Sequence, residues 1–186
     1  YLADRDGSTG PDVKGVAVIR RFDMATGTPS GETPVPAVEW FSDIAVAGDG
    51  TVYGTVSGGA QASDAATWQV WRIRPDGTAS AIIQGAPLQR PNGIALDAKG
   101  NLVVVNMLTP DVQTYSPDGT LLGTEQAAQA GNDGIVIMGD GTKYVSSVTQ
   151  GGISRIRPGQ PATLVAENIP NAASMCYDAG ANQLVV

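Results

Sequence analysis

The sequence has 186 residues, of which 42% are hydrophobic and 16% are charged, so it is long enough for one folded domain and is not disordered. Eleven Lys and Arg against eighteen Asp and Glu give a net charge of −7. This balance argues against nucleic acid as a partner, because phosphate binding needs clustered basic side chains. No His is present, which excludes a Ser-His-Asp triad, a His general base and His-containing zinc sites within these residues.

The sequence also bears on membrane spans, on the single cysteine and on the compartment. No apolar run reaches the ~18 residues of a membrane-spanning helix, so no membrane span is predicted. The single cysteine, Cys176, lies in an apolar stretch, and we expect it to be a buried small hydrophobic residue. Residues 1–4 are expected to be the end of a strand, so any targeting segment would precede them. The compartment stays open, with a soluble periplasmic or secreted protein favoured over a cytoplasmic one.

The first segment, residues 1–38, is predicted to be the remnant of a repeat. Residues 16–22 alternate between apolar and other side chains and then meet a polar turn at 23–28. Prolines at 29, 34 and 36 make the following stretch a connector.

From Trp40 onward the pattern becomes regular. Short apolar strands alternate with Asp-Gly turns, which favour hairpins because such turns require positive φ. Each Asp-Gly pair could be mistaken for a calcium loop, but the alternating carboxylates of such a loop are missing, so we predict turns. The pairs are Asp49-Gly50, Asp76-Gly77, Asp118-Gly119 and Asp140-Gly141.

The strands form a repeat whose first strand recurs four times. Ile44, Ile94, Ile135 and Met175 are equivalent positions, at spacings of 50, 41 and 40 residues. Four short strands per repeat of this length are typical of β-propeller blades, and the coils of a β-solenoid are shorter. We therefore predict an all-β fold with one partial propeller domain over residues 1–186. Its blades lie at about 40–88, 89–128 and 129–170, with blade remnants at 1–38 and 171–186.

This arrangement gives about four and a quarter blades. A propeller closes into a ring to protect its strand edges and the flat faces of its end blades. We expect a six-bladed ring, closed by the remainder of the propeller or by another chain.

Polar side chains stand where the repeated first strand begins. Ser42, Asn92 and Asp133 occupy equivalent positions, and Ala173 is the fourth. First strands line the central channel of a propeller, so these side chains are expected to converge. Their oxygens are hard ligands that suit Ca²⁺ better than Zn²⁺ or Cu. The alternative is that Asn and Asp before Gly only stabilise the turns into these strands.

Three segments resemble successive inner strands of the gluconolactonase, senescence-marker and luciferin-regenerating family. They are Phe-Ser-Asp-Ile at 41–44, Arg-Pro-Asn-Gly-Ile-Ala at 90–95 and Asn-Asp-Gly-Ile at 132–135. The resemblance covers nearly the whole chain and is strongest at residues 88–147. It implies a six-bladed, calcium-binding propeller that hydrolyses lactones, esters or phosphotriesters.

The resemblance also implies roles for individual residues. Asn92 and Asp133 fall on metal ligands of the family, and Asp133 also falls on its base or nucleophile. Ser42 stands where several members carry Asn, which implies a weaker ligand, and Ala173 is not a ligand. A Glu that completes the family's site would lie before Tyr1. The implied cofactor is Ca²⁺ or another divalent cation such as Mg²⁺, Mn²⁺ or Zn²⁺, and the implied partner is a small-molecule substrate.

In the implied mechanism the ion polarises a carbonyl or phosphoryl oxygen, and Asp133 or a water that it orients attacks. Two alternatives stay open: a non-catalytic propeller that binds a ligand or a protein, because a fold does not fix function, and a propeller similar to strictosidine synthase.

Other residues are candidates for substrate contacts. Arg90 and Asn106 are predicted to line the mouth of the site, the alternative being a solvated charge and an amide that caps a turn. Trp40, Trp68 and Trp71 could stack on a sugar ring, but Trp68 and Trp71 are expected to pack between blades. The polar insertion at 57–67 could be a lid over the channel.

Overall fold

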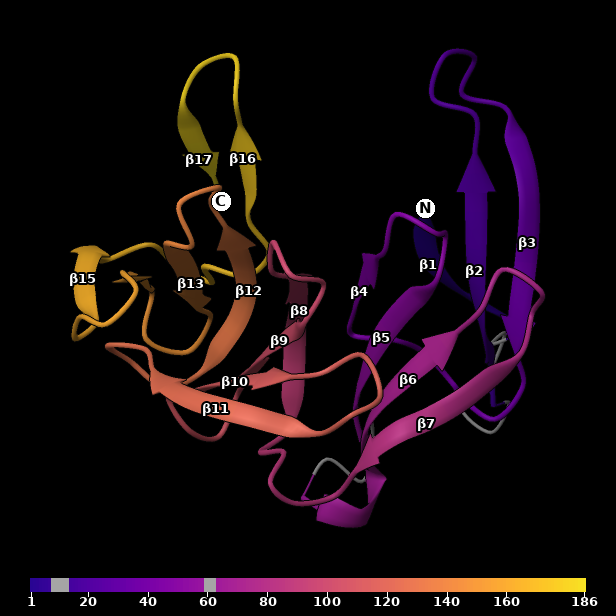
Figure 1. The fold of residues 1–186 in the computed structure, drawn as a ribbon, viewed down its shortest axis with the longest axis horizontal. Helices are drawn as coiled ribbons and strands as arrows, with labels where there is room; N and C mark the ends of the chain where they lie inside the picture. The colour runs from indigo at the N-terminus through magenta and orange to yellow at the C-terminus, as the bar shows by residue number, and fades with distance from the viewer. Residues whose placement is uncertain (8–13, 59–62) are drawn as a thin grey trace.

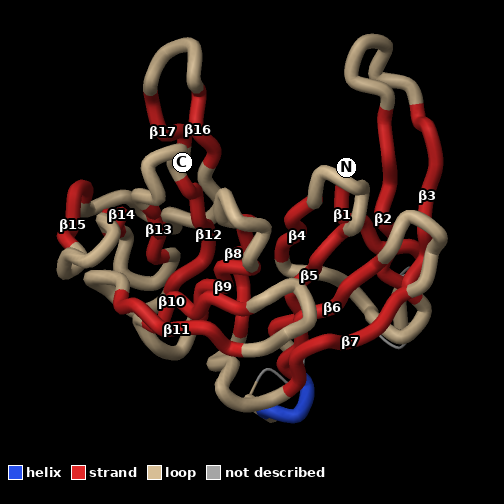
Figure 2. The backbone as a smooth tube through the Cα atoms, in the orientation of Figure 1, coloured by secondary structure: helices blue, strands red, loops and turns tan. Residues whose placement is uncertain are grey.

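The computed structural model describes residues 1–7, 14–58 and 63–186. Within these ranges nearly all of the regular structure consists of antiparallel strands, and a short 3-10 helix, η2 (Ala65–Thr67), stands out against them in Figure 2. Among the described residues, no helix has the length and apolar character needed to cross a membrane. The predicted all-β class is therefore confirmed.

Three complete sheets have four strands each, in sequential antiparallel order. The first contains β4 (Asp43–Val46), β5 (Val52–Ser57), β6 (Trp68–Ile73) and β7 (Ala79–Gln84). The second contains β8 (Pro91–Leu96), β9 (Leu102–Asn106), β10 (Asp111–Tyr115) and β11 (Leu121–Gln126). The third contains β12 (Asn132–Ile137), β13 (Lys143–Ser147), β14 (Gly152–Ile156) and β15 (Thr163–Ala166).

Two smaller sheets lie at the ends of the chain. The first joins β1 (Leu2–Asp6), β2 (Val16–Phe22) and β3 (Pro29–Val35), and the last joins β16 (Cys176–Asp178) and β17 (Gln183–Val185). Figure 1 shows the five sheets in an arc around a common centre, with β4, β8 and β12 on the inside and β7, β11 and β15 on the outside. The arc is open between the first sheet and the last. This is the arrangement of β-propeller blades.

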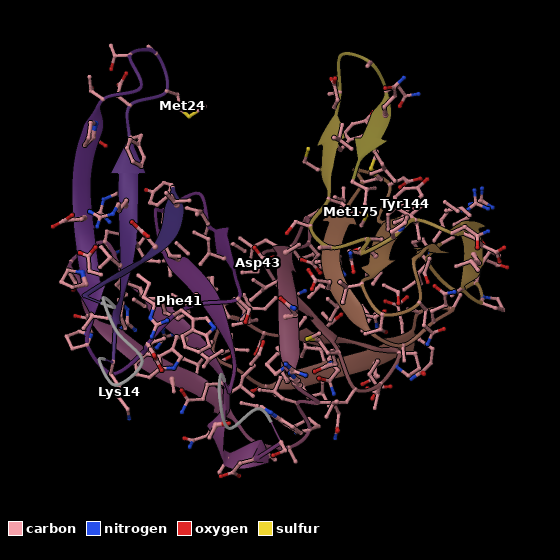
Figure 3. The ribbon with its side chains drawn as sticks, turned by 180° about the vertical axis from the view of Figure 1, so that it is seen from behind. Lys14, Met24, Phe41, Asp43, Tyr144 and Met175 are labelled. Atoms are coloured by element: carbon pink, nitrogen blue, oxygen red, sulfur yellow. The ribbon has the colours of Figure 1, made fainter. Side chains whose placement is uncertain are left out.

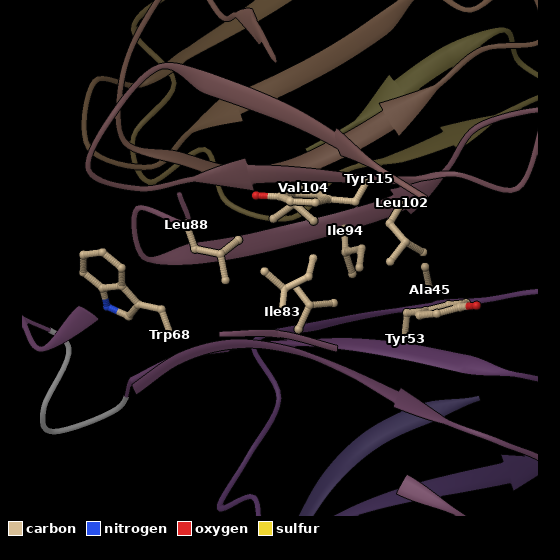
Figure 4. Packing of buried hydrophobic residues seen from close by; sticks show 10 residues of the cluster. Ala45, Tyr53, Trp68, Ile83, Leu88, Ile94, Leu102, Val104 and Tyr115 are labelled. Carbon is tan, nitrogen blue, oxygen red and sulfur yellow. The ribbon is translucent and has the colours of Figure 1, made fainter. Parts of the chain in front are cut away.

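The hydrophobic core lies between neighbouring sheets. One cluster joins the β4–β7 sheet to the β8–β11 sheet, and Figure 4 shows Tyr53 and Ile83 facing Val104 and Tyr115 across this interface. Trp68 belongs to the same cluster and Trp71 packs against the cluster on the other face of its sheet, so the prediction that both pack between blades is confirmed.

The predicted Asp-Gly turns are also confirmed. Gly50, Gly77, Gly119 and Gly141 all have φ between 84° and 94°. Three of the four aspartates accept a hydrogen bond from the backbone N–H two residues later, at 2.8–2.9 Å, and the exception is Asp118. Carboxylates used in this way stabilise the turn rather than forming a calcium loop.

The expectation that Cys176 is buried is wrong. Cys176 begins β16 and is exposed. The physical reason is that β16 and β17 form a two-stranded sheet that no further described sheet covers.

Candidate functional site

The inner strands of the three complete sheets lie next to one another, with β8 in contact with both β4 and β12. This brings two of the predicted residues together. The amide nitrogen of Asn92, in β8, donates a hydrogen bond to Oδ2 of Asp133, in β12, at 2.8 Å. The two residues are 41 positions apart in the sequence. Their contact therefore depends on the stacking of two blades.

Two glycines allow the inner strands to approach so closely. A Cβ added to Gly93 would lie 2.3 Å from the backbone oxygen of Asp133, and one added to Gly134 would lie 2.8 Å from the backbone oxygen of Ala173. The Asn-Gly and Asp-Gly pairs that the sequence repeats are thus needed because only glycine fits beneath the next strand.

Ser42 joins this group through a chain of hydroxyls. Its Oγ lies 2.6 Å from Oγ of Ser57, and Ser57 in turn donates to the backbone oxygen of Pro91, in β8. Because the single hydroxyl proton of Ser57 is used in that bond, Ser42 must be the donor to Ser57. The lone pairs of Ser42 Oγ then stay available to a ligand.

Asp43 is a part of the site that the sequence prediction missed. It stands at the position that Gly93 and Gly134 occupy in the next two repeats. Its Oδ2 accepts the backbone N–H of Ile94 at 3.0 Å, and its Oδ1 accepts that of Ile44 at 2.8 Å. Figure 3 shows Asp43 between β4 and β8, toward the centre of the arc. The sequence did contain a signal for Asp43, because this position holds a carboxylate where the next two repeats have glycine.

Burial raises the pKa of both carboxyl groups. For Asp43, desolvation is the main cause, hydrogen bonds from Ile94 and Ile44 oppose it, and the charge of Asp133 adds to it. For Asp133, desolvation raises the pKa and the hydrogen bond from Asn92 lowers it. Neither carboxylate forms an ion pair with a basic side chain in the described part of the chain. Among the described residues, these charges are therefore offset only by hydrogen bonds and not by a basic side chain.

These residues fit a hard divalent cation. Asn92, Asp133, Asp43 and Ser42 offer amide, carboxylate and hydroxyl oxygens, which are the ligands that Ca²⁺ prefers. A cation would also offset the repulsion between the two carboxylates. No group of three or more His, Cys, Asp or Glu side chains among the described residues forms a ready-made metal cluster. Any cation site here would depend on amide, hydroxyl or backbone oxygens and on water as well.

Arg90 precedes β8 and has an unusual conformation. Its φ is 61°, in the left-handed region that costs energy for a residue with a Cβ. Its Nε is buried without a hydrogen-bond partner, and its guanidinium makes no ion pair in the described residues. Arg90 thus keeps donors that a substrate could use.

Asn106 has a structural position instead. It is fully buried at the end of β9, and its Oδ1 accepts the backbone N–H of Gln89 at 2.8 Å. Its Nδ2 donates to Asp111 O and to Gln113 Oε1. Since both ends of the amide are used, Asn106 does not reach the mouth of the site. The geometry matches the alternative role, an amide that holds the turn before β8.

Two further candidates were predicted from the sequence. The guanidinium carbon of Arg5 stands 4.8 Å from the ring centre of Trp40, so one face of that indole is already covered. The predicted lid at 57–67 includes residues 59–62, which lie outside the described residues.

Comparisons with known proteins establish the fold. No protein-family model matches the sequence, and no curated protein matches it. Many solved structures do match, and they are β-propellers. A chain of a nidogen/laminin complex superposes with a TM-score of 0.70 at 20% identity, covering 92% of this chain and 66% of that one.

Two bacterial enzymes give similar superpositions. Virginiamycin B lyase from Staphylococcus aureus has a TM-score of 0.66 at 18% identity, covering 92% of this chain and 59% of that one. A gluconolactonase from Xanthomonas campestris has a TM-score of 0.62 at 21% identity, covering 91% and 64%. The chain spans 59–66% of the length of these three structures. At such low identities the superpositions show the β-propeller fold alone. The activity has to be argued from the residues of the site.

Proposed function

We propose that this chain carries much of the active site of a divalent-metal-dependent hydrolase that resembles gluconolactonase and acts on lactones, esters or phosphotriesters. The observation that carries the proposal is the pairing of Asn92 with Asp133 beside a second carboxylate, Asp43, neither carboxylate having an ion pair to a basic side chain in the described part of the chain. The gluconolactonases among the structural neighbours support the same choice. A six-bladed ring, closed by further strands, is part of this proposal.

Each residue has a defined task. Asn92 and Asp133 would hold the cation, which we propose is Ca²⁺ (or Mg²⁺, Mn²⁺ or Zn²⁺), with Ser42 as a weaker ligand. When bound, the cation supplies Lewis acidity toward a carbonyl or phosphoryl oxygen. Asp133 orients a water molecule or attacks directly, since a carboxylate can do either without His.

Two more residues support this chemistry from beside the pair. Asp43 adds negative charge to the site and holds the backbone of β8 in place through Ile94. Arg90 donates to an oxygen of the substrate with guanidinium hydrogens that form no ion pair among the described residues.

A second candidate is a non-catalytic propeller that binds a protein. The observation that favours it is the similarity to a chain of a nidogen/laminin complex, whose TM-score exceeds those of the enzymes. In that case the carboxylates would only hold neighbouring blades together.

Calcium titration of the full-length protein separates the two candidates. We expect heat of binding in calorimetry, a rise in melting temperature with Ca²⁺, and Ca²⁺-dependent hydrolysis of a panel of aldonolactones, aryl esters and phosphotriesters. The absence of both binding heat and thermal stabilisation at millimolar Ca²⁺ would overturn the proposed metal site. Binding without any hydrolysis would favour the scaffold.

A further inference from the structure

Met107 lies beside the candidate site and has no assigned role. It directly follows β9 and is half-buried. Its backbone N–H donates to Arg90 O at 3.0 Å, and its backbone oxygen accepts the N–H of Gly131 at 3.0 Å. The residue is thus fixed between the segment that leads into β8 and the one that leads into β12.

The sulfur of Met107 contacts the amide of Asn92. The Sδ atom lies 3.4 Å from Nδ2 of Asn92, the same nitrogen that donates to Asp133 Oδ2 at 2.8 Å. A thioether sulfur and an ionised carboxylate can only accept hydrogen bonds. Both amide hydrogens of Asn92 are therefore used on one side. Its carbonyl oxygen has no hydrogen-bond partner among the described residues and stays available to a ligand.

The neighbouring repeat shows the same arrangement independently. Ser57 stands three residues after Gly54, which pairs with Ile44, and Met107 stands three residues after Val104, which pairs with Ile94. Ser57 contacts the side chain of Ser42, just as Met107 contacts that of Asn92. In both blades, a residue at or just after the end of the second strand therefore contacts the polar residue at or just before the start of the first strand.

We propose that Met107 is a positioning residue for Asn92. The sulfur holds the amide nitrogen on the side of Asp133 and so directs the carbonyl oxygen of Asn92 toward the ligand of the site. Without the sulfur, one amide hydrogen loses its acceptor, and the amide can turn more freely about its broad terminal torsion. The part of this inference that concerns cation affinity rests on the proposed function, whereas the part that concerns the amide does not.

The test compares Met107→Leu with Met138→Leu in the full-length protein. Leu conserves the volume of Met and removes only the sulfur acceptor. Met138 is also half-buried but lies at the far end of β12, in the turn before β13. The main measurement is the side-chain amide NMR signal of Asn92, assigned by its disappearance in Asn92→Ala and recorded without Ca²⁺.

We expect Met107→Leu to shift the Asn92 amide signals and to weaken Ca²⁺ binding about threefold, with the melting temperature unchanged. Met138→Leu should change neither. Unchanged Asn92 signals in Met107→Leu would overturn the proposal, even if the Ca²⁺ affinity fell. Shifted signals in a protein that binds no Ca²⁺ would support the positioning role and count against the proposed function alone.

Discussion

Asn92 donates its amide hydrogen to Oδ2 of Asp133 across the boundary between two blades, at 2.8 Å. The bond connects the start of β8 with the start of β12, and the backbone oxygen of Asn92 in turn accepts the hydroxyl of Thr55 from the preceding blade. Three consecutive blades are therefore linked at the candidate site. A change in the packing between blades should therefore alter the geometry of the site, and a substitution in the site should alter the packing between blades.

Asp133→Asn should abolish Ca²⁺ binding and Ca²⁺-dependent hydrolysis while the fold persists. The amide oxygen of the new Asn can still accept the hydrogen from Asn92, and the cost of a half-buried charge disappears, so the melting temperature should be retained or raised. Circular dichroism, calorimetry and the hydrolysis panel check these points. The matched control is Asp140→Asn, in an exposed turn away from the site, which should keep its activity. Unchanged turnover in Asp133→Asn would refute the role assigned to it.

Ca²⁺ binding should weaken as the pH falls, and it should begin to weaken above the range expected for ordinary carboxylates. Burial raises the pKa of Asp43 and Asp133 from the usual 3.8, so protons compete with the cation earlier. Calorimetric titrations between pH 7 and pH 4 should show binding that weakens toward the acid end, with proton uptake by the protein once Ca²⁺ leaves. An affinity that stays constant over this whole range would contradict the involvement of these two groups.

The raised pKa values of Asp43 and Asp133 also determine how the free energy of unfolding changes with pH in the absence of metal. Between 3.8 and the raised pKa, the folded protein binds more protons than the unfolded chain. The contribution of Asp43 and Asp133 to the free energy of unfolding therefore falls as the pH rises through that window. Below 3.8 both states are protonated and this contribution no longer changes. Urea unfolding of the wild type and of Asp133→Asn should thus diverge as the pH rises, in favour of the variant.

The regular parts of this protein could be predicted from its sequence. The spacing of Ile44, Ile94 and Ile135, with Asp-Gly turns between them, was enough to place the strands of the three complete sheets and to recognise a propeller. The contact of Asn92 with Asp133 also followed, since equivalent positions in stacked repeats must lie side by side. Strand positions and contacts of this kind recur in each repeat, so the sequence contains several independent copies of the signal. The connector predicted from the prolines at 29, 34 and 36 was wrong, because β3 at the edge of its sheet accommodates proline and pairs with β2.

The rest depended on single departures from the repeat. Asp43 replaces a glycine, and only the stacked structure shows that its carboxylate reaches the backbone of β8. Asn106 was expected at a surface mouth, but the turn before β8 folds over it. Met107 carries no polar motif, so its contact with Asn92 could not be read from the sequence. Such positions are determined by contacts between blades, which have no periodic signal.

Gly93→Ala should destabilise the protein and disturb the site together. The new Cβ would meet the backbone oxygen of Asp133 at 2.3 Å, and that oxygen cannot move without shifting β12. We expect a loss of about 1–3 kcal/mol in the free energy of unfolding, as for other overpacked positions, and weaker Ca²⁺ binding. Gly123→Ala is the matched control, because nothing lies within 4 Å of its Cβ position in β11. Equal stabilities for the two variants would show that the blades do not approach as described.

Asn106→Ala should distinguish a structural amide from a substrate contact. The substitution removes the acceptor of the N–H of half-buried Gln89 and one of the donors to Gln113 Oε1, which still accepts the hydroxyl of Tyr115 at 2.9 Å. A fully buried donor without an acceptor costs about 1–3 kcal/mol, so urea unfolding should shift by up to that amount. At temperatures where the variant stays folded, the KM for any substrate found should be unchanged. A raised KM with unaltered stability would instead place Asn106 at the mouth of the site, against the buried position described above.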